Sequence, residues 1–216
     1  MTGPFEAEDA ATPLTPAERD GLIPTHVTLH GELNELEQQN IADAQAWAFE
    51  RKRDVLNEAF LRGLHRRMFN KVWRWAGDYR KTERNLGVAP HLIQPELIQA
   101  INDARFWVEH KSYEFDELAV RFHHKAVLVH PFANGRWARL AADLLVVGQG
   151  GTRFSWGGAK LQKAGEARKT YIDALHSADN HDFVPLCHFL PLQGRRMPDI
   201  ENLHHTSTLA VSALAR

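Results

Sequence analysis

The stretch from Val129 to Arg139, V-H-P-F-A-N-G-R-W-A-R, constrains the fold of this chain more than any other. A proline follows His130, which disfavours the α conformation at that histidine and ends a helix arriving from Glu117. Asn134 and Gly135 favour a tight turn and the cap of a new helix. Apolar residues then recur at helical spacing, namely Trp137, Leu140, Ala141, Leu144 and Leu145. The sequence therefore predicts a helix, a short loop and a second helix.

The second helix begins with a concentration of positive charge. Arg136 and Arg139 lie three residues apart on one face of its first turn, where unpaired N–H groups already carry a partial positive charge. Such an arrangement is favourable when an anion, phosphate above all, binds in front of it. His130, at the rim of this pocket, is placed to accept a proton from an attacking hydroxyl. In the alternative interpretation, Arg139 pairs with Asp143 at i,i+4 and His130 is an ordinary helix-end histidine.

The motif resembles the signature of a known family. H-P-F followed by N-G-R-x-x-R is similar to the pattern H-P-F-x-D/E-G-N-G-R-x-x-R of the Fic/Doc (filamentation-induced-by-cAMP) family. Further similarity to that family lies in Val72–Arg80, Asn85–Val88, Ser155–Gly158 and Tyr171–Phe189. Together these segments cover most of residues 30–192. Ala11–Pro16 and Gly31–Glu37 resemble the branch of the family called mobile mystery protein B.

The resemblance implies a fold and an activity. The expected fold is mainly all-α, a Fic-type helical bundle with a short β-hairpin flap. The expected division is an N-terminal arm over residues 1–30, a Fic-type domain over 31–192 and a C-terminal tail over 193–216. The implied activity is transfer of AMP from ATP to a Ser, Thr or Tyr hydroxyl of a protein target, as in bacterial, toxin-like members of the family.

The resemblance also assigns roles to residues of the motif and of the flap. His130 is the general base, and Phe132 anchors the loop in the core. Asn134 and Gly135 offer amide and backbone donors to the nucleotide phosphates, while Arg136 and Arg139 neutralise the outer phosphates. The target adds a strand to the edge of the flap at Leu86, Gly87 and Val88, a recognition mode that depends on backbone hydrogen bonds. The alternative for Thr82–Val88 is a packed surface loop.

The loop is two residues shorter than the family pattern. Asn134-Gly135 can match either the earlier D/E-G pair or the later N-G pair of that pattern. In both alignments the chain has no acidic residue in the loop. That carboxylate usually holds Mg²⁺ beside the nucleotide, so a magnesium cofactor is allowed but its usual ligand is absent, and no metal-binding residue is assigned. One alternative is therefore a nucleotide-binding Fic-fold module with weak or lost catalysis. Another is a Doc-like phosphotransferase, although that branch usually has lysine where this chain has Gly135.

A second resemblance concerns regulation. Fic proteins often carry an inhibitory helix with the pattern S/T-x-x-x-E-G/N, whose glutamate reaches the second motif arginine. Thr28–Leu33 resembles it, which makes Glu32 the predicted inhibitory residue and Glu35 the alternative. An internal carboxylate would relieve the repulsion between the two arginines and occupy the place of the γ-phosphate. The competing interpretation is that Glu32 only favours the first turn of its own helix.

The composition suits one globular domain with a substantial core, since 44% of the 216 residues are hydrophobic and 25% are charged. There are 26 basic and 27 acidic residues, so no overall field favours nucleic acid or a membrane, and neither is expected as a partner. The single cysteine, Cys187, excludes an intramolecular disulfide, and no run of about 18 apolar residues occurs. A cytoplasmic protein is the expectation.

The remaining pattern predicts further helices, at residues 32–53, 55–73, 95–109, 117–129, 166–176 and 183–190, besides the motif helix. Within the second of these, His65, Arg66 and Arg67 are predicted to lie on a solvated side. His123 and His124 are adjacent, so their side chains point about 100° apart on a helix, and no further ligand follows at a zinc-like spacing. A metal site there is disfavoured.

Overall fold

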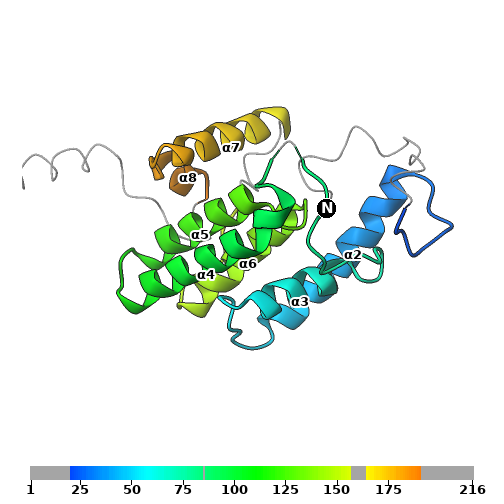
Figure 1. Cartoon of the computed structure of the whole chain (residues 1–216), viewed down its shortest axis with the longest axis horizontal. Coiled ribbons are helices and arrows are strands. Elements are labelled where there is room, and N and C mark those ends of the chain that lie inside the picture. Colours follow the sequence, from blue (N-terminus) through cyan, green and yellow to red (C-terminus); the bar gives the residue numbers. More distant parts are fainter. Residues whose placement is uncertain (1–19, 85, 157–163, 191–216) are drawn as a thin grey trace, which may run out of the picture.

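The fold was analysed in a computed structural model that describes residues 20–84, 86–156 and 164–190 (Figure 1). The helices in chain order are α2 His30–Phe49, α3 Glu58–Phe69, the short 3₁₀ helix η1 Pro90–Leu92, α4 Ile93–Glu109, α5 Phe115–Val129, α6 Gly135–Gly148, α7 Ala164–Asp179 and α8 Val184–Phe189. The prediction of a mainly all-α fold is confirmed. Most of the predicted arm, all of the predicted tail, Asn85, Gly157 and Gly158 lie outside the described residues.

Helix α5 lies at the centre of the arrangement. It packs between α4 and α6, and α8, which is paired with α7, covers another side of it. The α2–α3 pair packs against α6 (Figure 1). The motif loop joins α5 to α6 and therefore sits where the central helices meet the α2–α3 pair.

The apolar spacing read from the sequence explains why α5 and α6 are central. In α5, apolar residues spaced by three or four positions are all buried, namely Leu118, Phe122, Ala126 and Val129. The same holds for the predicted stripe of α6, at Trp137, Leu140, Ala141, Leu144 and Leu145. The indole N–H of Trp137 donates a hydrogen bond to the main-chain oxygen of Leu61, 2.9 Å away, so its polar atom is satisfied in the core and ties α6 to α3.

Several helix ends differ from the prediction by a few residues, and side chains explain two of them. Helix α2 ends at Phe49 instead of Arg53, since the Arg53 guanidinium turns back and donates to the carbonyls of Trp47 and Ala48 at the helix end. Helix α3 begins at Glu58 instead of residue 55, because the side chain of Asn57 caps it by accepting the N–H of Phe60 at 3.0 Å.

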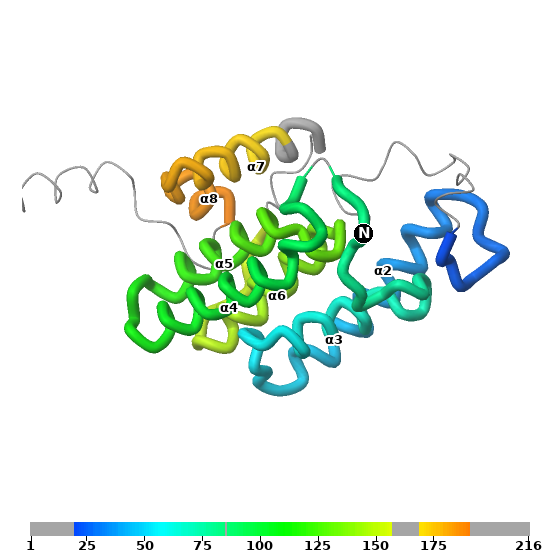
Figure 2. Tube along the Cα trace, in the orientation of Figure 1, coloured from blue at the N-terminus to red at the C-terminus, as the bar shows by residue number. Residues whose placement is uncertain are grey.

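The segment between α3 and α4 contains no strand among its described residues, so the predicted β-hairpin within residues 82–88 is not formed there. Figure 2 traces this segment from the end of α3 to η1. The guanidinium of Arg80 donates to the carbonyls of Thr82 and Val88, and these bonds take the place of a strand ladder. We keep the name flap for residues 82–88.

The described end of the predicted arm packs on the body of the protein. Leu22 and Val27 are buried, and Leu22 forms an isolated antiparallel β-bridge with Trp73. The N–H of Ile23 donates to the carbonyl of Val72 at 2.8 Å. Within the described ranges, no helix has the length and apolar character needed to cross a bilayer.

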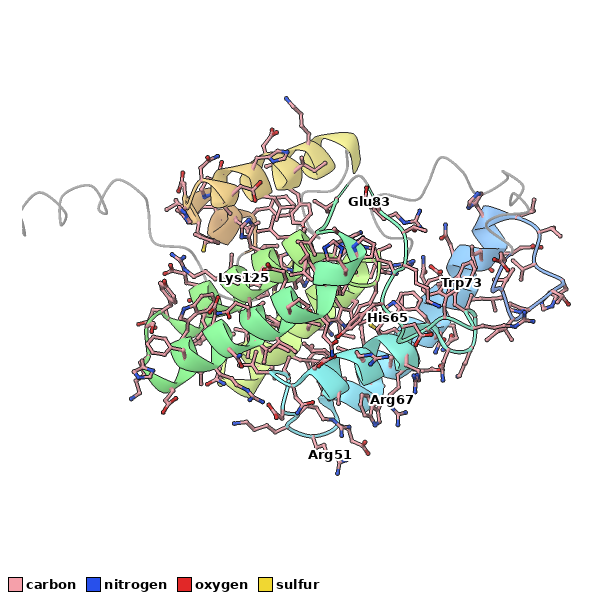
Figure 3. The ribbon with its side chains drawn as sticks, viewed as in Figure 1. Arg51, His65, Arg67, Trp73, Glu83 and Lys125 are labelled. Carbon is pink, nitrogen blue, oxygen red and sulfur yellow. The ribbon has the colours of Figure 1, made fainter. Side chains whose placement is uncertain are left out.

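The prediction of a solvated side at residues 65–67 is wrong for His65. Arg66 and Arg67 are exposed, but His65 has no exposed surface. It follows Leu61 by four residues and precedes Met68 by three, so it belongs to the buried stripe of α3. Figure 3 shows His65 on the side of α3 that faces the central helices.

Candidate active site

His130 ends α5 in an unusual backbone conformation. Its φ of 48° and ψ of 54° are left-handed, which costs a non-glycine residue about 1–2 kcal/mol. Its N–H still donates to the carbonyl of Ala126 at 3.0 Å. The pKa of the half-buried imidazole is lowered, first by burial and then by the positive charges of Arg80 and Arg84. The ring is therefore mostly neutral at pH 7 and able to accept a proton.

An aromatic stack fixes the loop that follows. Phe132 is only 3% exposed, and its ring lies 4.2 Å from that of His65, with the two planes 8° apart. Trp137 meets the same ring edge-on at 4.8 Å. His65 Nδ1 accepts the N–H of Gly77 at 2.9 Å, and burial lowers the pKa of His65 to about 3. The predicted anchor residue thus packs on a neutral histidine of α3.

Asn134 caps α6. Its side-chain oxygen accepts the main-chain N–H of Arg136 at 2.9 Å, and its own backbone is extended, as expected for an N-cap residue. Gly135 is exposed, and a Cβ added there would meet no heavy atom within 4 Å. The start of α6 is therefore open on the side of Gly135, where the sequence predicted donors to phosphate.

Arg136 is held by a carboxylate that the sequence analysis missed. Its guanidinium forms an ion pair with Glu37 of α2 and lies 5.6 Å from the ring centre of Phe69. Glu37 is 6% exposed, and its second oxygen accepts the indole N–H of Trp73 at 2.6 Å. Figure 3 shows Trp73 beside α2. A carboxylate of α2 therefore contacts a motif arginine, but the pair is Glu37 and Arg136, whereas the resemblance implied Glu32 or Glu35 at the second motif arginine, Arg139.

Glu32, the predicted inhibitory residue, lies elsewhere. Its carboxylate is exposed and accepts the main-chain N–H groups of Thr28 and Leu29, at 3.0 and 3.2 Å. These bonds lower the pKa of Glu32. They cap the start of α2, which is the competing interpretation considered for Glu32. The alternative glutamate, Glu35, is also exposed.

Arg139 is directed toward different helices from Arg136. Its charge acts on the pKa values of His123 in α5 and Tyr171 in α7, lowering both. Burial outweighs this effect for Tyr171, whose pKa rises to about 12, and dominates for His123, whose pKa falls to about 3. His123 Nε2 and the Tyr171 hydroxyl are hydrogen-bonded at 2.8 Å. Arg136 and Arg139 thus share the first turn of α6 but have different neighbours, Arg136 in α2 and α3 and Arg139 in α5 and α7.

The pairing of Arg139 with Asp143, considered as an alternative above, is not what the structure shows. Asp143 is 2% exposed and takes its partners from residues 153–156. It accepts the main-chain N–H of Phe154 and the indole N–H of Trp156, both at 3.0 Å, and it pairs with Arg153 at 3.3 Å. This buried carboxylate fixes the loop after α6 next to the site.

The flap lies directly on His130. A Cβ added to Gly87 would come within 2.7 Å of His130 Cβ, and the φ of Gly87 is +105°, so this close approach requires glycine. A pocket of about 390 Å³ separates Leu86 and Val88 of the flap from Ala100 of α4 and from the end of α5. The predicted docking residues therefore border a hollow next to the predicted general base.

The described residues do not fit a protein-bound magnesium ion at this loop. Ala133 occupies the loop between Phe132 and Asn134, and no carboxylate is present within the loop itself. The carboxylate that contacts Arg136 is that of Glu37, and both of its oxygens are already bound, one by Arg136 and one by Trp73. The described parts of the chain contain no group of three or more His, Cys, Asp or Glu side chains placed to hold a metal.

Comparison of the sequence with profiles of protein families identifies the family of the segment that carries this site. Residues 55–146, from before α3 to near the end of α6, match the profile of the Fic/DOC family. This segment belongs to the Fic/DOC family. It includes His130, the flap and both arginines, but not Glu37. A comparison with curated proteins found no match.

Solved Fic proteins share the fold. The VirB-translocated effector BepC from Bartonella tribocorum, solved with bound AMPPNP, is 19% identical with a TM-score of 0.59, over 81% of this chain and 98% of that chain. The Fic domain of Bep8 from Bartonella sp. 1-1C is 15% identical with a TM-score of 0.62, over 79% and 92%. Residues 134–508 of Fic-1 from C. elegans are 21% identical with a TM-score of 0.58, over 79% of this chain and 50% of that chain.

Two residues at the Fic site carry signals that the sequence analysis did not use. Glu37 falls on the apolar stripe of its helix, four residues after Leu33 and four before Ile41, and a charge at such a position requires a buried partner. Arg80 is the last residue of the Val72–Arg80 segment that resembles the family, and it contacts both the flap and the end of α5.

Proposed function

We propose that this protein transfers AMP from ATP to a hydroxyl side chain of a protein target. The observation that carries the proposal is the position of His130, a half-buried residue with a lowered pKa that contacts Gly87 of the flap and directly precedes the loop that leads to the arginines of α6. Membership of the family and the AMPPNP named for BepC support a nucleotide as the substrate.

In the proposed reaction, the target hydroxyl oxygen attacks the α-phosphorus of ATP. His130 takes the hydroxyl proton, the new bond joins the target oxygen to the α-phosphorus, and the bond from that phosphorus to the bridging oxygen breaks, which releases pyrophosphate. Arg136, Arg139 and the open start of α6 at Gly135 stabilise the negative charge of the phosphates. The chain supplies position and charge in this step, and the imidazole supplies the base.

The proposed target binds along the flap. Leu86, Gly87 and Val88 line the pocket next to α4, and an extended target segment would pair with main-chain groups of these residues other than the Val88 carbonyl, which Arg80 already binds. This mode delivers a hydroxyl side chain to His130, because Gly87 itself lies against that residue.

A pair of labelled substrates tests the proposal. The protein is incubated in a lysate with ATP labelled on the α-phosphate and, separately, with ATP labelled on the γ-phosphate. AMP transfer predicts protein labelling from the α-position alone. Labelling from the γ-position would instead identify the Doc-like phosphotransferase. The His130→Ala protein is the matched control, and any label that it still incorporates does not depend on this site.

A second candidate function is nucleotide binding with weak or lost catalysis. Two observations favour it: the loop has Ala133 and no carboxylate, and Arg136 is already occupied by Glu37. This candidate predicts saturable ATP binding, measured by calorimetry, without transfer of either label to any protein. Labelled protein that disappears in the His130→Ala control would exclude it.

We propose further that Glu37, and not Glu32, restrains the site. A carboxylate bound to Arg136 occupies a cation that an incoming phosphate needs, so nucleotide binding and the Glu37–Arg136 ion pair compete. The burial of Glu37 and its bond to Trp73 hold the carboxylate in place when no nucleotide is bound.

A further inference from the structure

Arg80 connects the two parts of the site that the proposed reaction must bring together. Its Nε donates to the main-chain oxygen of His130 at 2.9 Å, and its Nη2 donates to Val129 at 3.4 Å. On the flap side, Nη2 also donates to the carbonyl of Val88, and Nη1 donates to that of Thr82 at 3.0 Å. One guanidinium therefore binds carbonyls at the end of α5 and carbonyls of the first and last residues of the flap.

The contacts with α5 support the backbone conformation of His130. The last carbonyls of a helix lack partners within the helix and carry a partial negative charge, so a guanidinium at the oxygens of Val129 and His130 is favourable. The main-chain N–H of Arg80 donates in addition to the carbonyl of Pro131 at 2.9 Å. Arg80 thus holds the peptide groups on both sides of the left-handed His130 residue.

The contacts with the flap substitute for a strand ladder. Because the described residues of this segment form no strand, Thr82 and Val88 are joined through Arg80 instead of through each other. Gly87 packs against both Arg80 and His130 without room for a side chain. A Cβ at that position would come within 2.5 Å of Arg80 Nη2 and 2.7 Å of His130 Cβ. Among the described residues, the Arg80 side chain and the close approach of Gly87 both join the flap to His130.

We propose that Arg80 is a positioning residue that sets the distance between the flap and His130, so that a hydroxyl docked on the flap meets the imidazole. The inference rests on the proposed AMP transfer, in which the flap carries the target. It assigns no contact between Arg80 and the nucleotide. Arg80 acts through His130 and through Val88, and its loss should lower the rate of transfer without weakening ATP binding.

The test compares Arg80→Met, Arg80→Lys and Arg84→Met. Arg84 is the matched control because its charge also lowers the pKa of His130 and it lies in the flap itself, while among the described residues its side chain forms no hydrogen bond to other flap residues or to α5. The readouts are amide hydrogen exchange of Thr82–Val88, the pKa of His130 from NMR titration, the Kd for ATP, and kcat.

Arg80→Met is expected to speed exchange in the flap by at least about tenfold, the effect of one lost hydrogen bond to a charged group. It should raise the pKa of His130 and lower kcat by about 100-fold, with the Kd for ATP unchanged. Arg80→Lys keeps the charge but not the forked geometry, so it should restore the pKa of His130 while exchange stays fast and kcat stays low. Arg84→Met should raise the pKa of His130 and leave flap exchange unchanged.

Exchange of the flap in Arg80→Met at the rate of the unmodified protein would overturn the proposal, whatever the activity. So would an unchanged kcat when exchange is fast. If the unmodified protein transfers no AMP, the proposed function fails, but the exchange and titration readouts still decide whether Arg80 sets the flap. If Arg80→Met does not fold, Gly87→Ala tests the same distance, because it displaces the flap from His130 while Arg80 is retained; unchanged flap exchange and kcat in that variant would overturn the proposal.

Discussion

Glu37→Gln separates the two possible effects of the ion pair between Glu37 and Arg136. The substitution keeps the shape of the side chain and the oxygen that accepts the indole N–H of Trp73. It replaces the oxygen that faces the guanidinium with an amide NH2, so Arg136 loses both the negative charge and the hydrogen-bond acceptor. The competition described above predicts opposite changes in stability and in ATP affinity.

The loss of stability follows from the burial of the pair. The side chains of Arg136 and Glu37 are 24% and 8% exposed, so solvent screens their attraction only partly. A hydrogen bond to a charged group contributes roughly 1.5–3 kcal/mol, and the amide NH2 cannot accept one from Arg136, so the change should cost about 1.5–3 kcal/mol. For a protein of this size, that cost corresponds to a fall in Tm of about 3–12 °C.

The gain in ATP affinity has the same origin. A phosphate that binds Arg136 must first displace Glu37, and the substitution removes about 1.5–3 kcal/mol of that cost. The Kd for ATP should therefore fall by about 10- to 150-fold, since 1.4 kcal/mol corresponds to a factor of ten.

Thermal unfolding and titration calorimetry measure the two effects on the same preparations. Glu35→Gln is the matched control, because Glu35 lies on the same helix with an exposed side chain, and neither its Tm nor its Kd for ATP should change. The competition would be refuted by a Glu37→Gln protein that melts at lower temperature but binds ATP no more tightly than the original. In that case the ion pair orients Arg136 for the phosphate instead of blocking it.

Three further predictions concern the loop and the buried histidines. His130→Ala should reduce transfer by about 10²- to 10⁴-fold with an unchanged circular dichroism spectrum, and undiminished labelling would contradict its role as base. Phe132→Ala should cost about 3–5 kcal/mol in urea unfolding, because the ring is buried between His65 and Trp137, and a cost below about 1 kcal/mol would contradict its role as anchor. His65 and His123, both with pKa lowered to about 3, bind protons in the unfolded chain before they do in the fold, so stability should decline as pH falls below 6.5. The expected loss is about 3 kcal/mol by pH 5.5, measured by urea unfolding, and equal stability at pH 7 and 5.5 would refute it.

The sequence predicted the centre of the fold well because local rules act there without competition. Pro131 ends α5, Asn134 caps α6, and the apolar spacing of both helices agrees with their burial. Helix ends were less predictable where a side chain decides them. The bonds of Arg53 to the end of α2, and of Asn57 to the start of α3, are set by a particular rotamer and not by composition.

The contacts of the site depend on tertiary structure that no motif contains. The resemblance directed attention to Glu32, but α2 presents Glu37 to the core, and five residues along a helix turn the side chain by about 140°. His65 was read with its basic neighbours as solvated, although its spacing from Leu61 and Met68 indicated burial. The link that Arg80 makes to His130 spans 50 residues, so only the folded chain brings the two together.

The central claim is that His130 drives transfer of AMP to a protein hydroxyl, and mass spectrometry of the labelled target tests it most directly. The target labelled from α-phosphate-labelled ATP is isolated and digested, and the modified residue is mapped. The account predicts an adduct with the mass of AMP on a Ser, Thr or Tyr oxygen, present with the original protein and absent with His130→Ala. A phosphoryl adduct, or an AMP adduct formed equally well by the His130→Ala protein, would contradict it.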